Sequence, residues 1–264
     1  MKENGFINKN PYVYEKEDAV ISLFLLAGVL ALPLPGRAQS ADRLLQEAVA
    51  RRIRVQEKIE AIGLRVQTES YSRDLVDSFL AVFEEQERID RENLQLIDSL
   101  LRDGLPEGLT QNACGNLWML VANADAASMK KYLPELHKAA DRGLIAPNNM
   151  ALFEDKLAMA EGRPQRYGTQ LYEMPQYQGP LAYIWPVEDP ERLDSLRAGV
   201  GLFPIGQYVE ALERATGVRV VYDPALTLDS LNRLTNGAAM PLDPNVKYEI
   251  NPNLLLDADE ENAR

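Results

Sequence analysis

The chain has 264 residues, of which 46% are hydrophobic and 26% are charged. This composition excludes the low-hydrophobicity signature of intrinsic disorder and fits one globular domain with appendages. The formal net charge is −12, and Lys and Arg are scattered among acids, so we expect no nucleic-acid partner.

An apolar segment near the start of the sequence is typical of an export signal. Residues 19–32, AVISLFLLAGVLAL, carry no charge. The run is shorter than the ~20 residues of a membrane-spanning helix and fits the ~7–15 residues of a signal-peptide core. Small residues at Gly36 and Ala38 permit cleavage after Ala38. We therefore expect residues 1–38 to be a signal peptide and the protein to be exported, periplasmic or extracellular.

A membrane anchor is the alternative for the same segment. Residues 1–18 hold three lysines against four acids, a net charge of −1, whereas a signal peptide begins with positive charge. If residues 19–32 are not removed, they would tie the protein to the membrane.

Five helices are predicted next. Apolar residues recur at three- and four-residue spacing over residues 41–67, 72–101, 114–123, 128–141 and 149–161. Ser72 can cap the second helix, and the third, the most apolar, should be central and bury Cys114 as a small hydrophobic residue. Short polar joints favour a mainly α fold, a compact bundle of about five core helices. We expect residues 39–72 to form an N-terminal helix and residues 73–217 the helical domain.

The second half of the chain predicts a small sheet and a tail. Residues 166–174 and 178–185 are rich in tyrosine and alternate polar with apolar residues, which favours a two-stranded β-hairpin. Two further short helices are expected, from Asp189 to about Ala198 and over Ile205–Ala215. Val218–Tyr222 fits either a short strand or part of a tail. Prolines and acids then predict an extended acidic tail over residues 218–264, with disorder at both termini.

Common catalytic and metal-binding patterns are not favoured. The only histidine, His137, lies on a polar helix and the only cysteine, Cys114, on an apolar one, so a Cys–His pair is not expected. Acidic runs such as Glu84-Glu85 and Glu260-Glu261 are typical of solvated surfaces, and no glycine-rich loop follows a strand. We expect neither a metal site nor a cofactor.

The stretch EGRPQRYGTQ, residues 161–170, follows the fifth helix with many polar groups and little to bury. Gly162 and Pro164 can end the helix and Gly168 can supply a turn, which is a purely structural explanation. The stretch also resembles the Gln-x-Tyr-Gly-Thr-Gln signature of a bacterial family, the domain of unknown function 6624.

Further segments resemble that family, in its order, over about residues 74–212. They are Ile89–Asn93, Asp103–Pro106, Leu120–Asp125, Phe153–Lys156, Pro186–Asp189, and Leu196–Leu202 with Tyr208. The resemblance implies no function, because none is assigned to the family. Where the family has a histidine this chain has Asn123, and where it has an arginine this chain has Lys156. Because asparagine cannot shuttle protons near neutral pH, a catalytic role for that histidine in relatives would make this chain a non-catalytic member.

The matching polar residues could converge on one site. Three hypotheses follow. The first is a non-catalytic module that binds a small polar ligand, an envelope component or a protein partner through the Gln165–Gln170 loop. The second is a hydrolase or transferase with Asp90 or Asp155 as acid or base. The third is a structural clamp of buried charged pairs. The ligand-binding candidates are Asn93, Asn123, Gln165, Tyr167, Thr169, Gln170 and Arg197.

Overall fold

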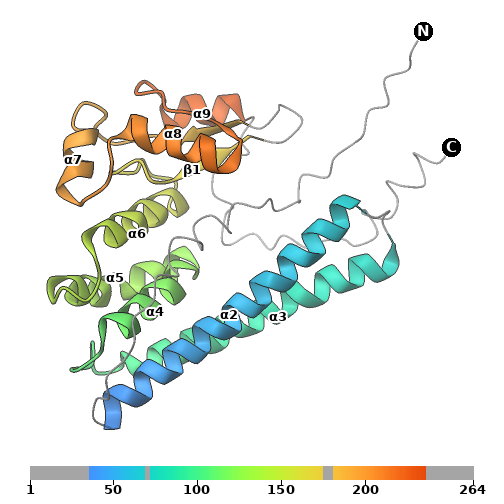
Figure 1. Cartoon of the computed structure of the whole chain (residues 1–264), viewed down its shortest axis with the longest axis vertical. Helices are drawn as coiled ribbons and strands as arrows, with labels where there is room; N and C mark the ends of the chain where they lie inside the picture. Colours follow the sequence, from blue (N-terminus) through green and yellow to red (C-terminus); the bar gives the residue numbers. More distant parts are fainter. Residues whose placement is uncertain (1–35, 69–71, 175–180, 236–264) are drawn as a thin grey trace.

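The computed structural model of the protein describes residues 36–68, 72–174 and 181–235, which contain eight helices and a three-stranded sheet (Figure 1). The mainly α fold predicted from the sequence is confirmed. The apolar run 19–32, the turn of the predicted hairpin and the acidic end of the chain lie outside the described residues. No helix among the described residues is both long and apolar enough to cross a bilayer.

The two longest helices, α2 (Gly36–Thr68) and α3 (Arg73–Leu100), lie against each other as a hairpin (Figure 1). The Ser72 hydroxyl accepts a hydrogen bond from the Leu75 backbone N–H at 3.2 Å, which is the predicted cap. Apolar side chains at three- and four-residue spacing, among them Leu45 on α2 and Ile97 on α3, are buried between the helices and the rest of the core.

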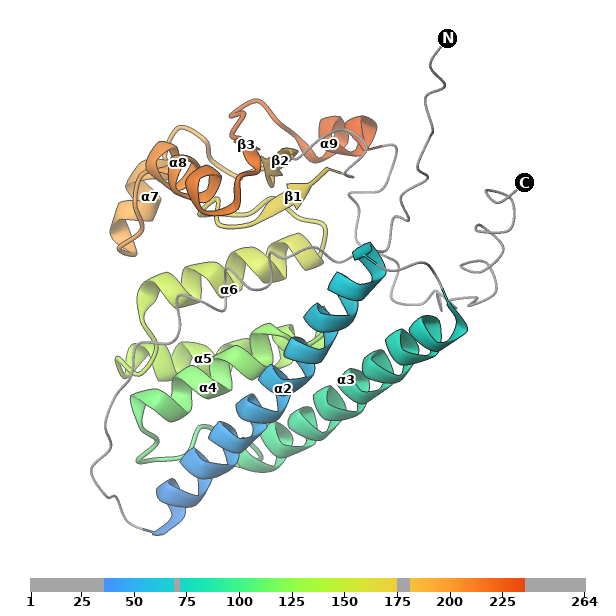
Figure 2. The same cartoon turned by 45° about the vertical axis from the view of Figure 1, so that its right-hand side comes forward.

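Three shorter helices stack on this hairpin: α4 (Gln111–Ala122), α5 (Ala126–Asp141) and α6 (Pro147–Ala160). Helix α2 packs on α4, α4 on α5 and α5 on α6 (Figure 2). As expected, α4 is central and Cys114 is buried in it. Pro134 lies inside α5, which continues through it without a break despite the missing backbone donor.

The sheet extends the predicted hairpin by one strand. β1 (Leu171–Glu173) pairs antiparallel with β2 (Leu181–Ile184), and β3 (Arg219–Val221) pairs parallel on the other side of β2. Helices α7 (Leu193–Gly199) and α8 (Ile205–Thr216) lie between β2 and β3 in the chain.

Of the two alternatives for Val218–Tyr222, the short strand is confirmed, and the extended tail predicted from residue 218 was wrong for the part of it that the structure describes. That part contains β3 and then α9 (Leu228–Leu234). Val220 pairs with Ala182, and Leu231 is fully buried against Trp185. Burial of these apolar side chains holds the segment to the domain.

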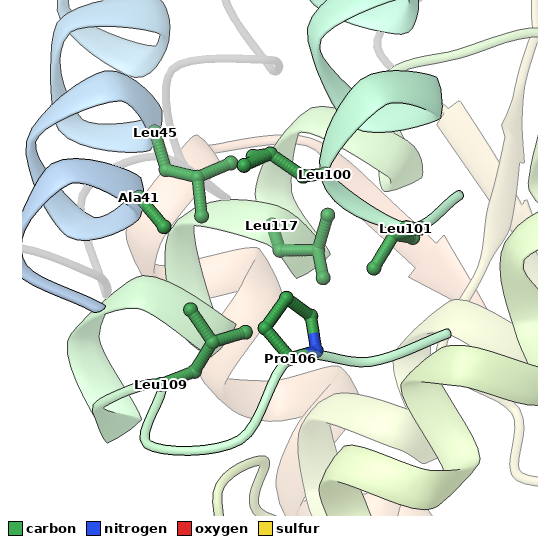
Figure 3. Close-up of a pocket in the computed structure, with 7 residues that line it drawn as sticks. All are labelled: Ala41, Leu45, Leu100, Leu101, Pro106, Leu109 and Leu117. Carbon is green, nitrogen blue, oxygen red and sulfur yellow. The ribbon is translucent and has the colours of Figure 1, made fainter. Parts of the chain in front are cut away.

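An apolar hollow lies where the start of α2 and the end of α3 meet α4 (Figure 3). It leaves no space for a guest the size of a water molecule, so we regard it as an imperfection of core packing and not as a binding pocket. The residues that line it are Ala41, Leu45, Leu100, Leu101, Pro106, Leu109 and Leu117.

Candidate functional site

The Asp155 carboxylate is the centre of the region that contains the Gln165–Gln170 loop. Asp155 lies on α6 and is 0% exposed. Its Oδ1 accepts hydrogen bonds from the backbone N–H groups of Arg166 at 2.8 Å and Tyr167 at 3.0 Å. Its Oδ2 accepts from the backbone N–H and the hydroxyl of Thr169, both at 2.9 Å. Successive N–H groups therefore converge on one carboxylate, an arrangement that offsets the cost of burying its charge.

Two effects act on the proton affinity of this carboxyl group in opposite directions. Burial raises the pKa of Asp155 above its ordinary value, and the N–H and hydroxyl donors of the loop oppose the increase. Four donors aimed at its two oxygens fit an acceptor, not an acid that still carries its proton.

Gly168 allows the loop to curl over Asp155. Its φ is +67°, in the left-handed region that favours glycine. A Cβ atom at this position would lie 3.3 Å from the Cδ1 atom of Ile205, at the start of α8. The loop and α8 are therefore in close contact.

The Gln165 side chain closes the loop from inside. It is fully buried, and its Nε2 donates to the carbonyls of Gln170 at 2.9 Å and Trp185 at 2.7 Å. Its Oε1 accepts from the Gln170 N–H at 2.8 Å. The Trp185 indole N–H in turn donates to the Arg163 carbonyl at 2.8 Å. The amide thus joins both ends of the loop to the end of β2.

Arg197, on α7, holds the outer turn of the loop. Its side chain is buried, and its NH1 donates to the carbonyls of Tyr167 at 2.5 Å and Gly168 at 3.3 Å. Its Nε donates to the Phe203 carbonyl at 2.6 Å. One guanidinium therefore binds two separate loops, which a lysine amine could not do with the same fixed geometry.

Tyr208, on α8, completes this network. Its ring lies under the Arg197 guanidinium at 4.8 Å, and its hydroxyl donates to the Thr169 carbonyl at 2.9 Å. We call Asp155, Gln165, Thr169, Arg197 and Tyr208 the clamp. The sequence had pointed to all five residues, and the structure brings them together.

The outer side of the same loop is accessible. Arg166 is exposed and Tyr167 is half-buried, with the Arg166 Cζ 5.7 Å from the centre of the Tyr167 ring. The hydrogen bonds of Tyr167 in the described part of the chain go through its backbone N–H and carbonyl. Gln170 is half-buried and its Nε2 donates to the Thr169 hydroxyl at 3.1 Å. The Tyr167 hydroxyl and the Arg166 guanidinium are thus available to a ligand.

Charged side chains of both signs surround Tyr167. Burial raises the pKa of its phenol, as do the nearby negative charges of Glu154, Asp155 and Glu188, while Arg166 opposes them. His137 Nε2 lies 3.4 Å from the Glu154 carboxylate, whose own pKa is raised by burial. We call Glu154, Arg166, Tyr167, Gln170 and Glu188 the outer face.

Asp90 and Asn93 lie elsewhere, between α2 and α3. The Asp90 carboxylate forms an ion pair with Arg52 Nε at 3.0 Å, and the Asn93 Oδ1 accepts from Arg51 at 3.4 Å. Burial raises the pKa of Asp90 and Arg52 opposes the increase. Because α4 and α5 separate α2 from α6, the structure does not bring these two residues to the loop.

Asn123 is also outside the clamp. It is the exposed C-terminal cap residue of α4, and its Nδ2 donates to the Met119 carbonyl at 2.9 Å. Asp125 then caps α5 by accepting from Ser128 at 2.9 Å. This segment forms the joint between two helices.

Three residues near the site were not singled out in the sequence. Trp185 follows the last residue of β2, two positions after Tyr183, and the rule that a buried indole N–H generally requires a partner is the signal that could have found it. Glu154 is adjacent to Asp155, and the sequence does not show which of these two acids is buried and which is partly exposed. Phe203 is 73% exposed in the loop between α7 and α8; an aromatic residue beside a proline in a short loop is the signal that could have found it.

Comparison with known proteins places these residues in a family. The model of a family of unknown function (DUF6624) matches residues 80–221, more than half of the chain, and this range contains the clamp and the outer face. Neither the curated proteins nor the solved structures gave a match. The resemblance seen in the sequence is confirmed: the chain belongs to the DUF6624 family.

Proposed function

We propose that the protein is a non-catalytic binding module that holds a small polar ligand or a segment of a protein partner on the outer face of the Gln165–Gln170 loop. One observation carries the proposal. The five hydrogen bonds to Asp155 fix the backbone at Arg166, Tyr167 and Thr169, while the Arg166 and Tyr167 side chains stay accessible. A loop that is already ordered loses little conformational entropy when it binds.

The outer face suits a ligand that has both donors and acceptors. Arg166 offers donors in a planar fork and Glu154 and Glu188 offer acceptors. Tyr167 adds a ring and a hydroxyl. A few polar groups of this kind around an aromatic wall are typical of sites for small polar molecules.

The surroundings of the two candidate acids support a non-catalytic role. A general base must reach a proton of its substrate, whereas Asp155 is fully buried and both of its oxygens accept hydrogen bonds from the loop. Asp90 is paired with Arg52 in a separate layer of the fold. Asn123, which replaces the histidine of the family pattern, cannot transfer protons near neutral pH.

We further propose that the module works outside the cytoplasm, on the strength of the uncharged run 19–32 and the small residues before residue 39. Components of the cell envelope are then the pool of ligands to test first. Cell fractionation with N-terminal mass determination would test this location, and an uncleaved protein in the cytoplasm would contradict it.

The binding proposal is tested by thermal unfolding of the purified protein against amino acids, amino sugars, N-acetylglucosamine oligomers and muropeptides. We expect a compound that raises the melting temperature of the wild type and not that of Arg166→Ala or Tyr167→Ala. Arg88→Ala, a change to an exposed arginine on α3, is the matched control and should respond like the wild type. A compound that stabilises wild type and Tyr167→Ala equally would overturn the proposal, as would a panel without any effect.

A further inference from the structure

Phe203 is the most exposed of the large hydrophobic residues that the structure describes, at 73%. A single exposed hydrophobic residue is common in proteins and needs no explanation by itself. The way in which its backbone is held sets Phe203 apart from the others.

The Phe203 loop is fixed on both sides. The Phe203 carbonyl accepts from Arg197 Nε at 2.6 Å, and the Leu202 N–H donates to the Arg197 carbonyl at 2.9 Å. After it, the Ile205 N–H donates to the Asp194 carboxylate at 2.7 Å. An aromatic ring on a fixed backbone has only two torsions to lose when it binds, which makes it an efficient anchor for a partner.

The guanidinium that fixes Phe203 also fixes Tyr167. Because Arg197 NH1 lies 2.5 Å from the Tyr167 carbonyl oxygen, this oxygen and that of Phe203 are within about 7 Å of each other, from the hydrogen-bond lengths and the width of a guanidinium. One partner in a standard interface covers about 800 Å². The backbones that carry Tyr167 and Phe203 are therefore close enough for one partner to reach both residues.

The charge near Tyr167 indicates the sign of that partner. The carboxylates of Glu154, Asp155 and Glu188 act on Tyr167 against a single opposing guanidinium, that of Arg166, so negative charge outnumbers positive charge around its phenol. The whole chain carries −12. A cationic side chain meets a favourable field here and can also lie against the Tyr167 ring.

We infer that Phe203 and the outer face form one surface, and that its occupant is a segment of another protein with a Lys or Arg next to an apolar side chain. The cation contacts Glu154, Glu188 and Tyr167, and the apolar side chain contacts Phe203. This inference rests on the proposed function: it names the class of partner and adds a second anchor.

The test uses a phage library of random dodecapeptides selected on the purified wild-type protein. Recovered peptides are synthesised with a fluorophore, and their Kd is measured by fluorescence polarisation. We expect the recovered peptides to combine a basic with an apolar residue. We expect Kd to rise at least about tenfold on Phe203→Ser and on Tyr167→Ala, the loss expected when an interface anchor is removed.

Leu64→Ser is the matched control, because Leu64 is also exposed, at 57%, but lies on α2. Its Kd should equal that of the wild type, and Phe203→Tyr should retain most of the affinity. Peptides that bind Phe203→Ser as tightly as the wild type would overturn the inference, as would a selection that enriches nothing. Self-association that Phe203→Ser abolishes would assign the surface to a second copy and also overturn it.

The outcomes separate this inference from the proposed function. If a compound from the thermal panel loses its effect in Tyr167→Ala and keeps it in Phe203→Ser, the outer face binds a small ligand and the inference fails alone. If peptides and compounds act on both variants as on the wild type, the inference and the proposed function fail together.

Discussion

The clamp and the contact between α2 and α3 both bury polar side chains, but they satisfy them differently. In the clamp, the side chains of Asp155 and Gln165 together take part in seven hydrogen bonds of 3.0 Å or less. Between α2 and α3, Asn93 has one bond of 3.4 Å, and its Nδ2 has no hydrogen-bond partner in the described part of the chain. A satisfied network specifies one geometry, whereas an unpaired buried group adds only its cost.

The polar residues that resemble the family pattern lie in two separate regions, the clamp and the contact between α2 and α3. Asp90 and Asn93 lie within the range that matches the family, but Arg51 and Arg52, which contact them, lie on α2 outside that range. The clamp draws every one of its members from the matched range. The clamp therefore lies wholly inside the matched range, whereas the contact of Asp90 and Asn93 with α2 crosses its boundary.

The largest effect is expected from Asp155→Asn, which tests whether the clamp holds the fold. The amide would turn an N–H₂ group toward backbone donors and remove the charge that they surround. We expect a loss of at least about 3 kcal/mol in the free energy of unfolding, measured by urea denaturation. Asp77→Asn, at an exposed ion pair on α3, should cost less than about 1 kcal/mol. Equal costs for the two changes would contradict the central role of Asp155.

A smaller loss is expected from Arg197→Lys. Lysine keeps the charge but cannot bind the carbonyls of Tyr167 and Phe203 together. We expect the free energy of unfolding to fall by about 2–3 kcal/mol, because at least one buried carbonyl loses its donor. Tyr208→Phe, which removes only the bond to the Thr169 carbonyl, should cost about 1 kcal/mol. A lysine variant as stable as the wild type would show that the two loops do not depend on the guanidinium.

Gly168→Ala tests whether the clamp depends on the left-handed backbone conformation of Gly168. Alanine is strained at a φ of +67°, and its Cβ would press on Ile205 at 3.3 Å. We expect a loss of about 1–2 kcal/mol. Gly206→Ala is the control: Gly206 lies in α8, and its added Cβ would meet no atom within 4 Å, so this change should be neutral or stabilising by up to about 1 kcal/mol. The two melting temperatures should therefore move in different directions, or only that of Gly168→Ala should move.

The sequence predicted the helices well and the contacts between distant segments less well, for a physical reason. Periodic apolar residues such as Leu75 and Ile97 report which side of a helix is buried, so the long helices could be found locally. The pairing of Val220 with Ala182 joins segments that no local pattern connects. The loop and Asp155 could be associated through the family resemblance. No sequence pattern showed that Asn93 faces α2, because sharing a helix face with Asp90 does not reveal which neighbour covers that face.

The smallest effect is expected from Asn93→Leu, which tests the contact between α2 and α3. Asn93 is 3% exposed and gains little from its single long bond. Leucine has a similar size and removes the buried Nδ2 group that has no partner in the described part of the chain. We therefore expect the free energy of unfolding to stay within about 1 kcal/mol of the wild-type value or to rise. Gln165→Leu makes the matched change to a buried amide in the clamp, where it would remove three hydrogen bonds to the backbone, and should cost about 2–3 kcal/mol. If urea denaturation gives the two variants the same loss, the contact between α2 and α3 is as well satisfied as the clamp, and the difference between the two regions is not one of hydrogen bonding.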